Sequence, residues 1–151
     1  MTEIVLLALV GNGIAVGVFC GTVLGGVPLL LALPGEQYVR AHGFLATRYD
    51  PFMPITIATT VLADILGAIM ASPLAAHLLC AVATILMASV MTVSVTKNVP
   101  INRWVSSQDP QALPSDWPTR RLRWQKWNAI RTALATTALA VNLAAAVVIV
   151  W

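Results

Sequence analysis

The sequence predicts an all-α integral membrane protein, a bundle of four transmembrane helices. Hydrophobic residues make up 58% of the chain and charged residues 10%, with a mean hydropathy of +0.82, whereas about a quarter of the residues in a soluble domain are charged. Four apolar runs each hold roughly the 20 residues that a helix needs to cross about 30 Å of hydrocarbon. All nine Lys and Arg residues fall in two segments, residues 40–48 and 97–131.

The four predicted spans are residues 4–33, 52–71, 74–96 and 130–151, joined by loops 34–51 and 97–129 and by a short turn. Because they use most of the chain, we expect a single domain, residues 1–151. The first run should remain as a helix rather than be removed as a signal peptide. Thr2 and Glu3 stand where a signal peptide has positive charge, and the apolar stretch is too long.

The orientation of the bundle is predicted from its basic loops. Four crossings place loops 34–51 and 97–129 on one face and both termini on the other, and short basic loops stay in the cytoplasm. We therefore expect both termini on the non-cytoplasmic side of a membrane, most simply the bacterial inner membrane. The net charge of +3 and pI near 9.3 then reflect loops beside anionic lipid head groups and require no nucleic acid.

The first span carries a glycine at every fourth position of one face: Gly13, Gly17, Gly21 and Gly25. Such a stripe lets another helix approach closely, which drives helix association in lipid. Its partner could be another helix of this chain or a second copy, in a homo-oligomer. Pro28 should kink the end of the helix, and Pro34 and Gly35 should end it.

The second span contains Asp64, the only acidic residue within any of the four predicted spans. Thr56, Thr60 and Asp64 share a helix face that should turn away from lipid. Asn12 and Asn142 lie at similar depth, which suggests a polar layer. Asp64 is a candidate proton-handling and substrate-binding residue. Alternatively, its carboxyl group only ties helices together, and the sequence leaves both interpretations open.

The third loop and its flanks hold the densest chemistry. Pro100 should end the third helix, and Ser115 or Asp116 followed by Pro118 should start the fourth outside the membrane. One face of that helix combines a guanidinium and two amides with small residues: Trp124, Asn128, Arg131, Ala135, Ala138 and Asn142. This face predicts a pocket at the cytoplasmic boundary of the bundle. Alternatively, the tryptophans form an interfacial belt and the arginines extend to head groups.

The chain resembles the anthrone oxygenase family, small four-span membrane proteins, over nearly its whole length. The resemblance is carried by Val27 to Leu29, Glu36 to His42, Tyr49 to Pro54, the turn Asn98 to Asn102, and the spacing of Arg123, Trp124, Asn128 and Arg131. It implies a membrane enzyme that converts an anthrone to an anthraquinone with molecular oxygen, without metal or flavin. Some relatives carry a histidine near the position of Asn128, and the asparagine of this chain puts a base at that position in doubt.

That chemistry needs a base, donors for an enolate oxygen and a pocket that excludes water. His42, the only histidine predicted on the cytoplasmic side, is the candidate base, although an exposed loop residue is the plainer interpretation. Arg131 and Asn128 are the candidate oxyanion donors. The predicted substrate-binding residues are Asn98, Asn102, Arg123, Trp124 and Asp64, with Trp124 stacking on a flat ring.

Other functions remain compatible with the same residues. The chain could be a non-catalytic membrane subunit that binds a quinone, a lipid or a partner protein. A transporter is weakened by the single acidic residue within the spans. A metal site is not expected, because the two histidines should lie at opposite faces and Cys20 and Cys80 have no metal-ligand spacing. We expect no cofactor, although haem held by His42 alone is conceivable.

Overall fold

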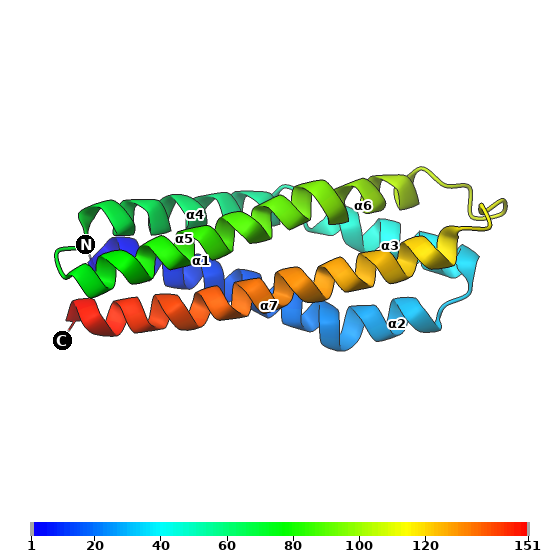
Figure 1. Cartoon of the computed structure of the whole chain (residues 1–151). Coiled ribbons are helices and arrows are strands. Elements are labelled where there is room, and N and C mark those ends of the chain that lie inside the picture. Colours follow the sequence, from blue (N-terminus) through cyan, green and yellow to red (C-terminus); the bar gives the residue numbers. More distant parts are fainter. Residues whose placement is uncertain (1, 151) are drawn as a thin grey trace.

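The computed structural model describes residues 2–150, and within them the chain is helical and contains no strand (Figure 1). Its α-helices are α1 (Thr2–Gly21), α2 (Val27–Ala32), α3 (Gly35–Arg48), α4 (Phe52–Met70), α5 (Leu74–Val93), α6 (Val99–Ser106) and α7 (Trp117–Val150). A π-helical turn, Thr22–Gly26, joins α1 to α2, and a second, Ser94–Asn98, joins α5 to α6. Each pair therefore forms one long helix.

Within residues 2–150, four helices are long and apolar enough to cross a membrane: Thr2–Ala32, Phe52–Met70, Leu74–Ser106 and Trp117–Val150. Helix α1 packs against α4 and α7, and α5 packs against the same two helices, so the four form a closed ring. Both termini and the turn between α4 and α5 lie at one end of the bundle, and the α2–α3 and α6–α7 connections lie at the opposite end (Figure 1). Helix α3 runs back from that end and meets α4 near the middle of the bundle (Figure 1). The predicted helical membrane bundle is confirmed.

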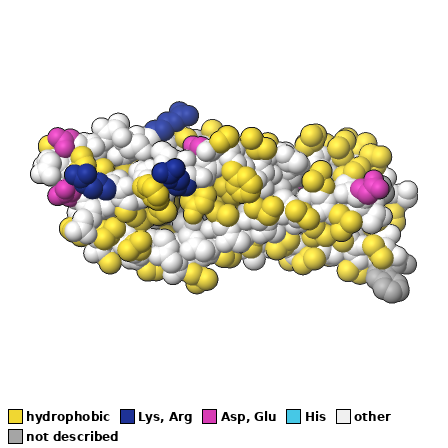
Figure 2. Space-filling view, turned by 180° about the vertical axis from the view of Figure 1, so that it is seen from behind, with side chains coloured by type: hydrophobic (Ala, Val, Ile, Leu, Met, Phe, Trp, Pro, Cys, Tyr) yellow, Lys and Arg dark blue, Asp and Glu magenta, His cyan; other side chains and the backbone are white. Residues whose placement is uncertain are grey.

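The bundle is longer than a bilayer is thick. The three longest helices have 31, 33 and 34 residues, or about 47–51 Å at 1.5 Å per residue, against about 30 Å of hydrocarbon. The excess lies at the end that carries the basic residues, where α3 packs against α6. On the face shown in Figure 2, the visible Lys and Arg side chains lie in one half of the molecule. The hydrocarbon of a bilayer therefore cannot cover the whole length of these three helices.

The expectation that Pro100 ends the third helix is wrong, because the helix continues to Ser106. Proline lacks an N–H and its ring clashes with the carbonyl four residues earlier. The π turn directly before it relieves both problems: the Val99 N–H bonds to the Ser94 carbonyl, five residues back, and Pro100 stands in the first turn of α6. Pro28 follows the other π turn in the same way.

Two helix boundaries agree with expectation. The first long helix ends at Ala32, because Leu33 before Pro34 is extended, and α7 begins at Trp117, directly before Pro118. The segment predicted as the first loop, in contrast, contains the 14-residue helix α3. Its apolar side buries Tyr38, Val39 and His42 against the basic end of the bundle.

The glycine stripe does not pack against another helix of this chain. A Cβ atom added to Gly13, Gly17, Gly21 or Gly25 would have no atom within 4 Å. The close approach of α1 to α4 occurs instead at Gly11, where an added Cβ would collide with the Thr60 hydroxyl. Helix association in this chain therefore uses a different face of α1, and a second copy as partner of the stripe stays a prediction.

Candidate functional site

A cavity of about 510 Å³ lies inside the basic half of the bundle. Its walls come from the first π turn and its flanks, α3, the start of α4, the second π turn and the inner face of α7. Most of the wall is aliphatic. The polar and aromatic side chains on it include Phe19, His42, Ser94, Asn102, Trp124 and Arg131. A mostly apolar chamber with a few converging polar groups is typical of a small-molecule site.

His42 lies on the buried side of α3 and is only 2% exposed. Its Nε2 lies 3.0 Å from Oδ1 of Asn102, and its Nδ1 lies 3.0 Å from the hydroxyl of Tyr38. In this orientation of the amide, Nε2 carries the proton and donates it to Asn102, so Nδ1 of the neutral ring accepts from Tyr38. Both ring nitrogens are therefore satisfied by the protein.

Burial makes the neutral ring the stable form. Desolvation lowers the pKa of His42 below its ordinary value of 6.5, although the bond to Asn102 opposes the shift. Burial likewise raises the pKa of the Tyr38 phenol to about 12, against the opposing charge of Arg121. At neutral pH the pair is thus an uncharged imidazole beside an uncharged phenol.

Aromatic rings hold the imidazole in place. The ring of Tyr38 meets His42 edge-on at a centroid distance of 5.3 Å, and Trp124 lies at 4.7 Å with the planes inclined by 59°. Trp117 stacks on the far side of Tyr38 at 5.6 Å. The indole Nε1 of Trp124 has no hydrogen-bond partner among the described residues. The π face of Trp124 is thus partly covered by His42, which limits the predicted stacking on a substrate.

Arg131 lines the cavity from α7, one turn after Asn128. Its Nε and Nη2 donate to the Asn128 side-chain oxygen at 3.2 and 2.8 Å, and its guanidinium lies 4.5 Å from the centroid of the Phe19 ring. Within residues 2–150 it forms no ion pair. The cavity therefore contains a guanidinium that is oriented by an amide and forms no ion pair among the described residues, while Asp50 contributes a carboxylate elsewhere on its wall.

Two predicted site residues lie behind the wall rather than on it. Asn98 and Asn128 are completely buried and do not line the cavity. Asn98 donates to the Trp124 carbonyl at 3.4 Å, and Asn128 accepts from Arg131. The Asn98 Oδ1 and Asn128 Nδ2 atoms have no partner within the described chain. In this geometry both amides support residues of the wall instead of contacting a ligand.

Two other predicted site residues, Arg123 and Asp64, lie outside the cavity. Arg123 is exposed and lines a separate groove on the outside of the bundle. Asp64 is buried in the opposite half, beside Asn142, and its two carboxyl oxygens have no hydrogen-bond partner among residues 2–150. Asn12, also buried, bonds to the backbone of α7 when its amide is turned to satisfy both polar atoms. The three residues predicted to form a polar layer are all buried, but none of them lines the cavity.

Sequence reasoning missed Arg121 and Tyr38. Arg121 donates to the carbonyls of Leu30 and Leu33 at 2.9 and 3.0 Å, and its guanidinium lies over the Trp117 ring at 4.7 Å. It thereby satisfies carbonyls left free at the end of α2 and ties α7 to that end. Its partners are backbone atoms about 90 residues away, so no sequence pattern identifies them. Tyr38 precedes His42 by one helical turn, a spacing that could have suggested the pair.

The mouth of the cavity opens on the side of the bundle. Several residues of its lining are exposed. They lie in the first long helix (Gly21, Gly25 and Leu29), just before α4 (Tyr49) and in α4 (Pro54 and Ala58). Gly21 and Gly25 belong to the glycine stripe, and the missing side chains leave space at this edge. The glycine stripe thus widens the entrance to the cavity along the apolar surface of the first long helix.

A protein-family model described as "Anthrone oxygenase" matches residues 44–141. The matched region runs from the end of α3 through most of α7 and includes Asn102, Trp124 and Arg131, while His42 lies just before it. No curated protein and no solved structure matches the chain.

Proposed function

The chain belongs to the anthrone oxygenase family, and from that premise we propose that it is a membrane-embedded, cofactor-independent oxygenase. Its substrate is a flat, phenolic or enolisable hydrophobic molecule, and its oxidant is molecular oxygen. The observation that supports this most is that His42 and Arg131 line the same cavity. A neutral imidazole and a guanidinium without an ion pair can serve as the base and as the oxyanion donor when a proton is removed from a CH2 group conjugated with a ketone.

The volume and lining of the cavity suit such a molecule. About 510 Å³ falls within the range of roughly 300–1,000 Å³ found for small-ligand sites. The aliphatic walls would cover the ring faces, while Arg131 and Asn102 present polar groups for oxygen atoms at the ring edge. The dry surroundings would strengthen the attraction between a developing oxyanion and the guanidinium.

In the first proposed step, His42 removes a proton from the CH2 group between the aryl rings. Nε2 faces Asn102 at the cavity wall, so this nitrogen must act as the base. It is free to do so in the tautomer that carries the proton on Nδ1, where Nδ1–H donates a hydrogen bond to the Tyr38 oxygen, 3.0 Å away. The substrate then takes the place of Asn102 at Nε2, and Arg131 holds the enolate oxygen.

In the second step, the electron-rich enolate reduces oxygen. One electron passes to O2, and the carbon radical and superoxide combine into a peroxide at the former CH2 carbon. The peroxide anion takes back the proton held by His42, and the hydroperoxide then loses water, which includes the remaining proton of that carbon, to leave a ketone. The balance is one CH2 compound and one O2 giving one ketone and one water. The chain's own contribution is to bind the substrate, move the proton and stabilise the oxyanion.

The orientation in the membrane is part of this proposal. Both termini lie at the end without basic residues (Figure 1), and the positive-inside rule places them on the non-cytoplasmic side. The cavity would then lie at the cytoplasmic boundary of a bacterial inner membrane, and the chain would act as one four-span domain. Its lateral mouth would admit a hydrophobic substrate directly from the bilayer.

A second candidate is a non-catalytic subunit that binds a quinone, a lipid or a partner protein. One observation favours it: both ring nitrogens of His42 already have partners within the protein. A binding protein needs such a satisfied, rigid wall, whereas a base must exchange one partner for its substrate.

Oxygen uptake by the detergent-purified protein with an anthrone tests the proposal, together with an absorption spectrum and metal analysis of the same sample. A colourless, metal-free protein that consumes one O2 per anthrone supports the oxygenase. A coloured or metal-loaded protein contradicts the cofactor-free mechanism, and an inert protein that binds the anthrone supports the second candidate. His42→Ala should lower turnover by about 10²–10⁴-fold, the usual effect of losing a general base. His77→Ala, at an exposed site at the other end, is the control.

A further inference from the structure

A second hollow lies on the outside of the bundle, between α7 and the segment formed by the second π turn and α6. It is an open groove of about 760 Å³. It shares no lining residue with the cavity that contains His42. Its cationic side chains are Lys97, Arg120, Arg123 and Lys126. No carboxylate contributes to its lining, so the groove concentrates positive charge.

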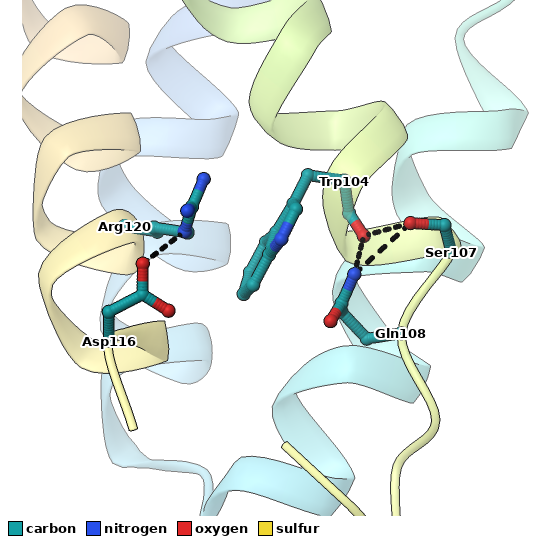
Figure 3. Close-up of polar contacts among 5 residues, drawn as sticks. All are labelled: Trp104, Ser107, Gln108, Asp116 and Arg120. Atoms are coloured by element: carbon teal, nitrogen blue, oxygen red, sulfur yellow. Dashed lines mark hydrogen bonds and ion pairs between the residues drawn. The ribbon is translucent and has the colours of Figure 1, made fainter. Parts of the chain in front are cut away.

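Three of these cations are available to a ligand. Lys97, Arg123 and Lys126 are exposed, and none forms an ion pair within residues 2–150. Arg120 is engaged: it pairs with Asp116 at 2.7 Å and lies 4.5 Å from the centroid of the Trp104 ring. Figure 3 shows these contacts. They join α6 to the start of α7 and leave the remaining cations unpaired.

The side chains of the groove are of the kinds found at the depth of lipid head groups. Lys97 Nζ is 5.3 Å from the centroid of the Trp127 ring, and Trp and Lys side chains are typical of the membrane interface. Beyond Arg131, α7 has no further charged residue up to Val150, so the apolar surface begins about one turn past Trp127. Ile101, Leu122 and Trp127 add apolar area to the groove itself.

We propose that this groove binds the phosphate head group of an anionic phospholipid from the surrounding bilayer. Lys97, Lys126 and Arg123 would surround the phosphate, and the acyl chains would continue along the apolar surface of α7. Basic recesses between helices on the cytoplasmic side suit anionic lipids for this reason. A membrane lipid fits better than a soluble phosphate compound because the groove joins the lipid-facing surface and has apolar as well as basic walls. Arg123 is thus assigned to lipid rather than to substrate.

Native mass spectrometry of the full-length protein in detergent tests this assignment. The probes are phosphatidylglycerol, phosphatidylcholine and the soluble compound glycerol 3-phosphate. We expect the wild type to bind phosphatidylglycerol in preference to phosphatidylcholine. The double variant K97Q/K126Q should bind it roughly 30-fold more weakly, since each cation near an anionic lipid contributes on the order of a fivefold change.

The charge-matched control is R40Q/R48Q, which removes two exposed cations from α3 at the same end of the bundle. It should bind phosphatidylglycerol like the wild type, and both variants should unfold at the wild-type temperature in phosphatidylcholine. Equal weakening in both variants would mean general attraction and overturn the site, as would no weakening in either. Glycerol 3-phosphate binding as tightly as the lipid would overturn the lipid as occupant. None of these outcomes depends on oxygenase activity.

Discussion

Nε2 of His42 and Oδ1 of Asn102 lie 3.0 Å apart although 60 residues separate them in the chain. The contact joins α3, a helix outside the spans, to α6, the extension of the third span beyond its π turn. It exists only because that span continues past Pro100. The π turn therefore determines which polar group faces the imidazole.

Tyr38→Phe should lower turnover because it removes the hydroxyl oxygen that accepts a hydrogen bond from Nδ1–H in the catalytically competent tautomer of His42. A loss of one neutral hydrogen bond, about 0.5–1.5 kcal/mol, corresponds to a decrease of up to roughly tenfold in kcat. Tyr38 is a positioning residue, so the acid limb of the pH profile of kcat should shift as well. Steady-state kinetics from pH 5 to 8 measures both. An unchanged profile with unchanged kcat would remove Tyr38 from the mechanism.

Arg131→Gln should lower kcat/KM by about 10²–10³-fold, the usual effect of losing an oxyanion donor. Arg131→Lys should retain part of the activity, because the charge remains but the two bonds to Asn128 do not. Arg103→Gln, at an exposed site without an ion pair within residues 2–150, is the matched control. Wild-type kinetics for a folded Arg131→Gln protein would contradict the assigned role.

The stability of the protein should fall in mild acid because His42 is buried as the neutral ring. Its pKa in the folded state is lowered below 6.5, so the unfolded state binds a proton first as the pH decreases. The stabilisation is thus complete above pH 6.5 and is lost between 6.5 and the lower folded value. Thermal unfolding in detergent at pH 7.5 and pH 5 measures the loss, which should be smaller in His42→Gln. His77→Gln should behave like the wild type.

The lateral mouth of the cavity makes a prediction about Gly21. Because an added Cβ meets no atom within 4 Å, Gly21→Leu should fold normally and place a side chain in the entrance. We expect kcat/KM for a hydrophobic substrate to fall by about tenfold, equivalent to roughly 1.4 kcal/mol, with little change in kcat. Gly13→Leu adds the same side chain to the same stripe away from the cavity and should have no effect. Equal kinetics in the two variants would contradict entry at this edge.

The helical membrane architecture could be predicted from the sequence because it depends on local properties. The length of an apolar run and the 3.6-residue period determine where a helix crosses and which face it turns inward. The buried positions of Thr60 and Asp64 and the start of α7 beside Pro118 follow from such patterns. The same period placed Arg131 on the inner face of α7, where it lines the cavity.

The tertiary structure decided the relationships that depend on several segments at once. Pro100 is one example. The lost hydrogen bond and the steric clash of a proline inside a helix are avoided here only because the preceding turn is π-helical. The glycine stripe that includes Gly21 has no neighbouring helix within the described chain, because α1 approaches α4 at Gly11 instead. That contact depends on how both helices pack. Arg123, only one residue from the cavity-lining Trp124, points into the outer groove. Periodicity sets the direction of a side chain around its own helix, but only the assembled bundle determines what it meets there.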